Sequence, residues 1–188
     1  MVMHGGDDGN LYEYGLPHEF IFKKTKDMLQ TLDAGNGETI PTLSEVFNLI
    51  KSSKIFVNIE LKGPRTPHLA ASYDCTLAAE SVLSAVSAHA MHGRFLISSF
   101  NHDDLLHEVK RARLAYMRSG LHTYFDVIYL QNYHNEPLID HSNWLPTFSG
   151  DGINVSANHV SRELVEACKS RSLKVGVWIR MCDFAETD

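Results

Sequence analysis

The sequence predicts an α/β fold in which parallel strands alternate with helices. Short apolar runs and helical patterns follow one another along most of the 188 residues, and the connections between them are short. This alternation is typical of parallel strands joined by crossover helices. An open doubly wound sheet and a closed (β/α)8 barrel both meet this description. No glycine-rich phosphate-binding fingerprint follows any of the strands, which favours the barrel.

The clearest strand is IFVNIELKG, residues 55–63. Side chains alternate along a strand, so residues two apart share a face. Ile59 and Leu61 belong to an entirely apolar face, whereas Glu60 and Lys62 belong to a face that becomes polar toward the end of the strand. The sequence therefore predicts a carboxylate and an ammonium group side by side at the carboxyl end of a hydrophobic strand.

Capping signals mark the starts of the helices. Thr42 and Glu45 have the spacing of a capping box, Asp74 and Ser161 are N-cap residues, and Asn101 is a natural N-cap directly after an apolar run. The expected elements are a helix at 42–50, a helix at 74–92 that ends at Gly93, a strand at 94–100, a helix from 101, a strand at 152–157, a helix at 161–172 and a closing strand at 173–181.

Two segments break the alternation. Residues 5–41 contain the turn-rich stretches GGDDGN and GNGE, and we expect a loop lobe inserted above the strand ends. Residues 119–151 form a long irregular excursion that is rich in Tyr, His and Asn. Excursions of this length in a compact domain are often functional. We otherwise expect one domain over residues 1–188.

Composition excludes several classes of protein. The net charge of −6 argues against a nucleic-acid-binding surface, which requires a basic patch. No apolar run reaches the roughly 18 residues of a transmembrane helix, and MVMHGGDDGN lacks the features of a secretory signal. The three cysteines, at 75, 168 and 182, are odd in number and widely spaced. They predict reduced thiols in a cytoplasmic compartment.

Candidate site residues lie where the strands end, because parallel α/β folds collect their active sites there. A first strand at VMHGG ends at His4, the second ends at Glu60 and Lys62, the third ends at Phe100, and the closing strand carries Trp178. A carboxylate can hold Mg²⁺ or Ca²⁺ through oxygen, a lysine can neutralise a phosphate, and a histidine can move a proton near pH 7. Cleavage of a phosphate ester needs all three.

Structural roles are the alternative for each of these residues. Glu60 and Lys62 can form an ion pair on one strand face without a metal, His4 can be an ordinary histidine, and Trp178 can be barrel packing. His89 and His92 have a spacing compatible with a metal pair, yet His89 continues an apolar helical stripe, which favours a buried or capping histidine. Ser98 and Ser99 lack the G-x-S-x-G elbow of a nucleophilic serine.

Several motifs together resemble the glycerophosphodiester phosphodiesterase family, in the order in which that family has them. His4 after an apolar strand resembles a catalytic histidine of the family, and VNIELKG (57–63) resembles its metal-binding Glu-x-Lys strand. LISSFNHDDL (96–105) is similar to its Ser-Ser-Phe strand end, and LKVGVWIRM (173–181) to its final strand. LDAGNGETIPTLSEVFNLI (32–50) is similar to the segment that follows the inserted lobe.

The resemblance implies a (β/α)8 barrel that hydrolyses glycerophosphodiesters to glycerol 3-phosphate and an alcohol. It implies that Glu60 binds a divalent metal, Mg²⁺ or Ca²⁺, and that His4 protonates the leaving oxygen. Lys62 would lie near the phosphate, and Phe100 and Trp178 would line the glycerol pocket. The expected partner is thus a small-molecule glycerophosphodiester, with no nucleic acid and no transmembrane segment; the sequence does not indicate the oligomeric state.

The sequence departs from the family pattern at both ends. The His-Arg-Gly and Glu-x-Asp strands of the family are absent, and the expected strands amount to about six of the eight in a barrel of about 250 residues. We therefore expect a barrel domain truncated at both ends, with impaired activity and a tendency to aggregate or to form oligomers. Two alternatives are a non-catalytic protein that binds phosphorylated ligands through Lys62 and Arg65, and a related sphingomyelinase or lysophospholipase-D-like barrel.

Overall fold

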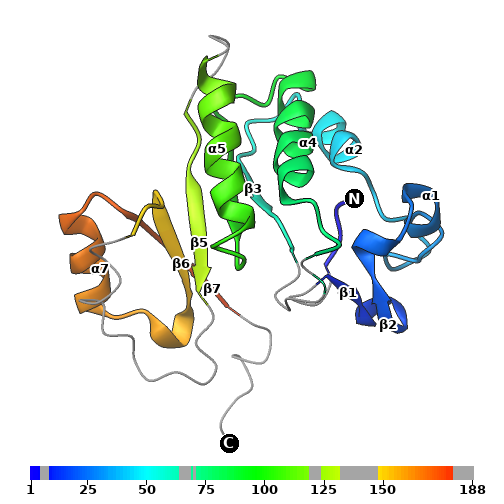
Figure 1. The fold of residues 1–188 in the computed structure, drawn as a ribbon, viewed down its shortest axis with the longest axis horizontal. Helices are drawn as coiled ribbons and strands as arrows, with labels where there is room; N and C mark the ends of the chain where they lie inside the picture. Colours follow the sequence, from blue (N-terminus) through cyan, green and yellow to red (C-terminus); the bar gives the residue numbers. More distant parts are fainter. Residues whose placement is uncertain (5–8, 64–68, 70, 119–123, 132–147, 180–188) are drawn as a thin grey trace, which may run out of the picture. The chain divides into compact units, whose positions relative to one another are not determined.

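The computed structural model describes residues 1–4, 9–63, 69, 71–118, 124–131 and 148–179. The chain forms two compact units, Met1–Phe125 and Asp126–Asp188, whose helices and strands are labelled in Figure 1. None of the described helices is both long and apolar enough to cross a membrane. Cys75 and Cys168 are free thiols, and Cys182 lies outside the described residues.

The first unit begins with a small lobe of antiparallel strands and short helices. The strands β1 and β2 pair antiparallel, and Gly15 adopts a φ of 73° at the turn between them, a conformation that glycine reaches without steric cost. The predicted lobe of loops therefore has regular structure within residues 9–41. Its elements are β1 (Asn10–Leu11), η1 (Tyr12–Tyr14), β2 (Leu16–Phe20), η2 (Ile21–Lys23) and α1 (Lys26–Leu29).

The rest of the first unit alternates helices with parallel strands, as the sequence predicted. β3 and β4 are parallel neighbours, with Val57 opposite Phe95 and Glu60 opposite Ser98. A parallel pair needs a crossover connection, and α4 lies in that connection. The elements are α2 (Leu43–Ile50), β3 (Val57–Glu60), α4 (Cys75–Ala88), β4 (Phe95–Ser99) and α5 (Leu105–Arg118).

The capping residues act as predicted, with one shift. Thr42 and Glu45 form a complete capping box at the start of α2, and Asp74 accepts a hydrogen bond from the backbone N–H of Leu77 at the start of α4. Asn101 accepts hydrogen bonds from the N–H groups of Asp104 and Leu105. Because a turn precedes α5, that helix begins at Leu105 rather than directly after Asn101.

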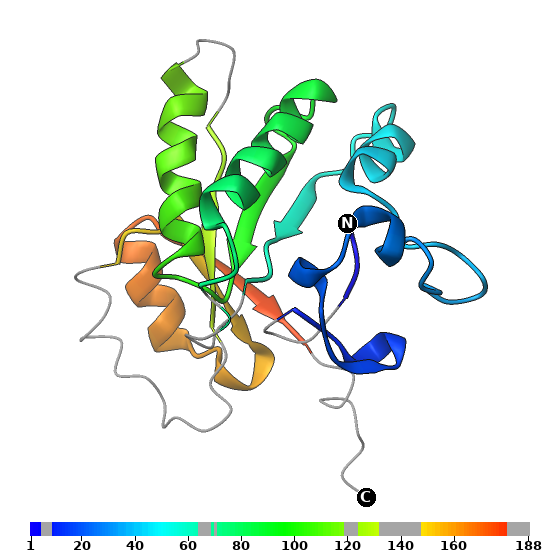
Figure 2. The ribbon, with the colours of Figure 1, turned by 45° about the vertical axis from the view of Figure 1, so that its right-hand side comes forward.

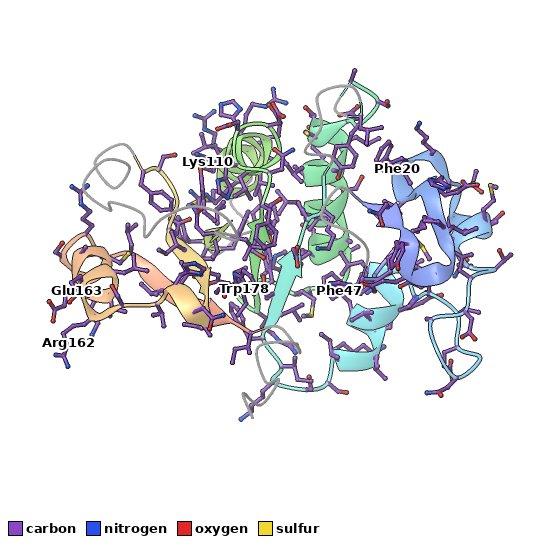
Figure 3. All side chains as sticks on the ribbon, turned by 90° about the horizontal axis from the view of Figure 1, so that it is seen from below. Phe20, Phe47, Lys110, Arg162, Glu163 and Trp178 are labelled. Atoms are coloured by element: carbon purple, nitrogen blue, oxygen red, sulfur yellow. The ribbon has the colours of Figure 1, made fainter. Side chains whose placement is uncertain are left out.

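The core of the first unit lies between the helices and the parallel strands. α4 and α5 lie side by side (Figures 1 and 2), and Phe47 lies on the side of α2 that faces α4 (Figure 3). The ring of His89 packs 5.8 Å from that of Phe47 between centroids. His92 Nδ1 lies 2.5 Å from the hydroxyl of Tyr116 on α5. Both histidines therefore have structural partners, and His89 is the C-cap residue of α4, in agreement with the apolar stripe that favoured a buried or capping histidine.

In its described residues, 126–131 and 148–179, the second unit has three parallel strands in the order β5-β6-β7. Ile128 lies opposite Gly152, which lies opposite Lys174 in the next strand. Gly176 cannot carry a side chain without movement, because a Cβ there would lie 2.0 Å from Asn154 Oδ1. The elements are β5 (Val127–Gln131), β6 (Gly152–Ser156), η4 (Ala157–His159), α7 (Arg162–Ser170) and β7 (Lys174–Trp178).

Two sequence expectations about strands were wrong. The described residues 1–4, expected to form a strand that ends at His4, have no regular secondary structure. Conversely, the segment 119–151, expected to be irregular, contains the strand β5. Val127 to Leu130 are all buried, and a fully apolar strand of this kind is usual when both faces of a parallel sheet are covered.

Arg94 joins the end of α2 to the start of β3. Its guanidinium group donates hydrogen bonds to the backbone carbonyl oxygens of Ile50 and Lys51 at 3.2 Å each, and of Ile55 at 3.0 and 3.2 Å. The last carbonyl groups of a helix have no partner within the helix. A planar group with several donors can bind them together, which a lysine cannot do.

We expect Arg94→Lys to lower the free energy of unfolding by about 1–3 kcal/mol, since several hydrogen bonds from one charged donor are lost, one of them at the partly buried carbonyl group of Ile50. Urea unfolding followed by circular dichroism measures the change. Arg111→Lys is the matched control, because Arg111 is 60% exposed and pairs with Glu108 on one helix, where ion pairs contribute little. Equal losses in the two variants would contradict the role of Arg94.

Candidate functional site at the carboxyl end of β3

The carboxyl end of β3 brings Glu60 and Lys62 together. Because they are two residues apart in an extended backbone, their side chains lie on the same side of it. Lys62 Nζ donates a hydrogen bond of 2.7 Å to Glu60 Oε1, and the side chains of Lys62 and Glu60 are 18% and 32% exposed. The ion pair, which the sequence left open as an alternative, is therefore present. Partial burial strengthens such a pair relative to one in water.

The two serines at the end of β4 hold this strand end in place. Ser98 and Ser99 are fully buried. Ser98 Oγ donates to Asn58 Oδ1 at 2.8 Å, and Ser99 Oγ donates to the backbone oxygen of Leu61 at 2.6 Å. Leu61, between the two charged residues, is thus fixed to β4. These hydroxyl groups have structural partners, in agreement with the sequence argument against a nucleophilic serine.

His4 lies next to the cavity that β3 lines, since Met3, directly before it, is one of the lining residues. Its Nδ1 is 2.6 Å from Glu13 Oε1, and the histidine side chain is 71% exposed. His4 is not among the residues that line the cavity beside Glu60 and Lys62. One ring nitrogen is therefore engaged by a carboxylate of the lobe. The assignment of His4 as the proton donor remains a prediction.

Phe100 and Trp178, the two aromatic residues predicted to line a substrate pocket, belong to different units. Phe100 follows β4 in the first unit and is half-buried. Trp178 ends β7 in the second unit, where its indole N–H donates to the backbone oxygen of Gln131 at 3.2 Å; Figure 3 labels it. Trp178 therefore has a partner within its own sheet, and the substrate-binding roles of both residues remain predictions.

A cavity of about 440 Å³ lies along β3 within the first unit. Every residue from Val57 to Lys62 lines it, so the Glu60–Lys62 pair is its charged part. Residues 1–3, Tyr73 and parts of α2, α4 and the lobe form the remainder. Its volume is within the range of about 300–1,000 Å³ that is typical of small-molecule sites.

Two aromatic residues of this cavity were missed in the sequence. The rings of Phe22 and Tyr73 meet edge to face with centroids 6.0 Å apart, and both line the cavity. Burial, with a smaller contribution from Cys75, raises the pKa of Tyr73 to about 12. The only local signal for Tyr73 is its place directly before the capping residue Asp74. Phe22 has none, because its position depends on the fold of the lobe.

A second cavity, of about 600 Å³, lies at the starts of α4 and α5 and is strongly acidic. Asp74, Asp104 and Glu108 line it together with Cys75. Burial, followed by the charges of these carboxylates, raises the pKa of the Cys75 thiol to about 11. The thiol is therefore protonated at neutral pH and is a poor nucleophile.

The described residues do not by themselves provide enough ligands for a divalent metal ion. Among them, no group of three or more His, Cys, Asp or Glu side chains is placed to hold an ion. Hard cations such as Mg²⁺ and Ca²⁺ take several oxygen ligands. Glu60 offers one carboxylate, and that carboxylate is paired with Lys62.

Comparison with known sequences identifies a relative. No protein-family model matches the sequence. The chain is 28% identical over 166 residues to a glycerophosphodiester phosphodiesterase of Caldanaerobacter subterraneus subsp. tengcongensis. The match covers 85% of this chain and 60% of the relative. The chain therefore spans less than two thirds of the length of that enzyme.

Solved structures show the same fold. A protein of Galdieria sulphuraria assigned to the glycerophosphodiester phosphodiesterases matches 95% of this chain and 65% of its own with a TM-score of 0.71 at 24% identity. A glycerophosphodiester phosphodiesterase of Parabacteroides distasonis matches 82% of this chain and 57% of its own with a TM-score of 0.60 at 24% identity. The partial barrel fold is thus confirmed, and the chain is a relative of the glycerophosphodiester phosphodiesterases.

Proposed function

We propose that this chain carries part of an active site that hydrolyses glycerophosphodiesters to glycerol 3-phosphate and an alcohol. The observation that carries the proposal is the half-buried Glu60–Lys62 pair, which lines a cavity at the carboxyl end of a parallel strand. Parallel α/β folds place their sites at this end of the strands. The relative from Caldanaerobacter subterraneus, which is 28% identical, is named a glycerophosphodiester phosphodiesterase, and this supports the same reaction.

In this proposal Lys62 binds the phosphate. An ammonium group that is mostly shielded from water attracts an anion more strongly than an exposed one. Hydrolysis breaks the bond between phosphorus and the leaving oxygen, water supplies the hydroxyl group on phosphorus, and a proton goes to the alcohol. We assign the proton transfer to His4, of which Glu13 engages one ring nitrogen. We propose that Phe100 and Trp178 bind the glycerol moiety of the substrate.

We propose that Glu60 binds a divalent cation, Mg²⁺ or Ca²⁺, because the resemblance to the glycerophosphodiester phosphodiesterase family implies one. The part of the chain that the structure describes contributes this single carboxylate, and the ion would compete with Lys62 for it. Hydrolysis by the 188-residue chain is therefore expected to be slow. A cytoplasmic location is part of the proposal and is supported by the free thiols of Cys75 and Cys168.

A second candidate is a binding protein without catalysis. The pairing of Glu60 with Lys62 favours it, since a carboxylate engaged by an ammonium group is a weaker metal ligand. Lys62 would then hold a phosphorylated ligand, together with Arg65, which lies outside the described residues. The two candidates differ in whether glycerol 3-phosphate is released from a diester.

Release of glycerol 3-phosphate from glycerophosphocholine tests the proposal. We expect slow release that Mg²⁺ or Ca²⁺ increases, and we expect Glu60→Gln to remove the effect of the ion. Glu80→Gln is the matched control, because Glu80 is exposed on α4 and does not line the cavity. Binding of glycerol 3-phosphate without any release of product would instead support the binding protein.

The role of His4 is tested separately. We expect His4→Ala to lower the rate of product release by about 10²–10⁴, the usual contribution of general acid–base catalysis. His18→Ala serves as the control, since His18 is exposed in the lobe. Rates that agree between the wild type and His4→Ala would remove His4 from the mechanism while leaving Lys62 in place.

A further inference from the structure

One face of the helix α5 combines basic side chains with exposed apolar ones. Lys110, Arg111, Met117 and Arg118 each lie three or four residues from Leu114 along the helix, so these five side chains are neighbours on its surface. Leu114, at the centre, is 56% exposed, and Met117 is exposed as well. Figure 3 labels Lys110. These five residues are called the α5 face below.

The α5 face is basic in a chain whose net charge is −6. The helix carries four basic side chains and a single acidic one, Glu108. The carboxylate of Glu108 accepts a hydrogen bond of 3.0 Å from Thr76 on α4 and pairs with Arg111, so it lies on the side of α5 that faces α4. The positive charge is therefore concentrated around the exposed apolar side chains.

An exposed aromatic ring lies next to the α5 face. The guanidinium group of Arg113 lies 4.6 Å from the centre of the Tyr124 ring, and Tyr124 is an exposed residue. Arg113 is four residues before Met117, so the two are neighbours on the helix surface. A tyrosine ring, with an apolar body and a polar tip, is favoured at a boundary between water and lipid.

We propose that the α5 face binds the surface of a lipid bilayer that contains anionic lipids. The negative potential of such a surface attracts basic side chains that lie within a Debye length of it. The exposed side chains of Leu114 and Met117 gain free energy when they enter the boundary between headgroups and acyl chains. The inference does not depend on the proposed function, because none of the five residues lines the cavity beside β3.

The mixture of charges and apolar groups favours a bilayer over other polyanions. The phosphates of a nucleic acid attract the basic side chains but offer no partner to Leu114 or Met117. An amphipathic peptide binds best in a groove, and none of the five residues lines either cavity described above. A bilayer surface accepts both kinds of side chain from the convex surface of a helix.

Co-sedimentation of the 188-residue chain with lipid vesicles tests the inference. One set of vesicles contains phosphatidylcholine and phosphatidylserine in equal amounts, and the other contains phosphatidylcholine alone. We expect binding to the anionic vesicles and little binding to the neutral ones. Binding should weaken strongly between about 0.1 M and about 1 M NaCl, because the Debye length falls from about 10 Å to about 3 Å.

Two matched pairs of variants locate the binding surface. Arg118→Gln should weaken binding to the anionic vesicles about fivefold, since one cation near the surface is lost. Arg162→Gln, at an exposed position on α7, should leave it unchanged. Leu114→Ala should weaken binding about three- to tenfold. Leu77→Ala should not, although Leu77 is 60% exposed, because α4 has no basic residue.

Lys62→Met separates the α5 face from the candidate site, because a phospholipid headgroup is itself a phosphodiester. Vesicle binding that is lost in Lys62→Met and kept in Arg118→Gln would overturn the inference. Equal binding to anionic and neutral vesicles, or equal losses in Leu114→Ala and Leu77→Ala, would overturn it as well. Binding of polyglutamate without binding of vesicles would indicate an acidic protein partner and would also contradict the inference.

Discussion

The parallel pairing of β3 with β4 is the constraint on which the candidate site depends. It places Glu60 opposite Ser98, and the buried hydroxyl groups of Ser98 and Ser99 bind Asn58 and the backbone of Leu61. The strand is thus held before Glu60 and again between Glu60 and Lys62. Since side chains alternate along a strand, a shift of one residue would exchange the charged and the apolar faces, and the pairing therefore fixes where Glu60 and Lys62 point.

Local signals predicted most of the fold. The caps at Thr42, Asp74 and Ser161 act through hydrogen bonds within a few residues, so the sequence contains them in full. The prediction of a strand that ends at His4 was wrong, because a short apolar run forms a strand only when it pairs with another strand. β5 was missed because its apolar run lies in a long excursion without clear turn signals.

The site could be predicted only in part, because most of its contacts join residues that are far apart in the sequence. Glu60 and Lys62 are two residues apart, and strand geometry alone brings them together. Phe22 and Tyr73 meet across many intervening residues, and no pattern in the sequence predicts that contact. The pairing of His4 with Glu13 depends on the fold of the lobe. The contacts of Arg94 with the end of α2 are equally remote in sequence.

The central claim is that the ammonium group of Lys62 binds a phosphate. The most direct test is the affinity of glycerol 3-phosphate for the wild type and for Lys62→Met, with Lys54→Met as the exposed control. The loss of a charge-assisted contact of about 1.5–3 kcal/mol corresponds to a Kd that rises roughly ten- to hundredfold. A Lys62→Met protein that is folded and binds glycerol 3-phosphate as tightly as the wild type would contradict the claim.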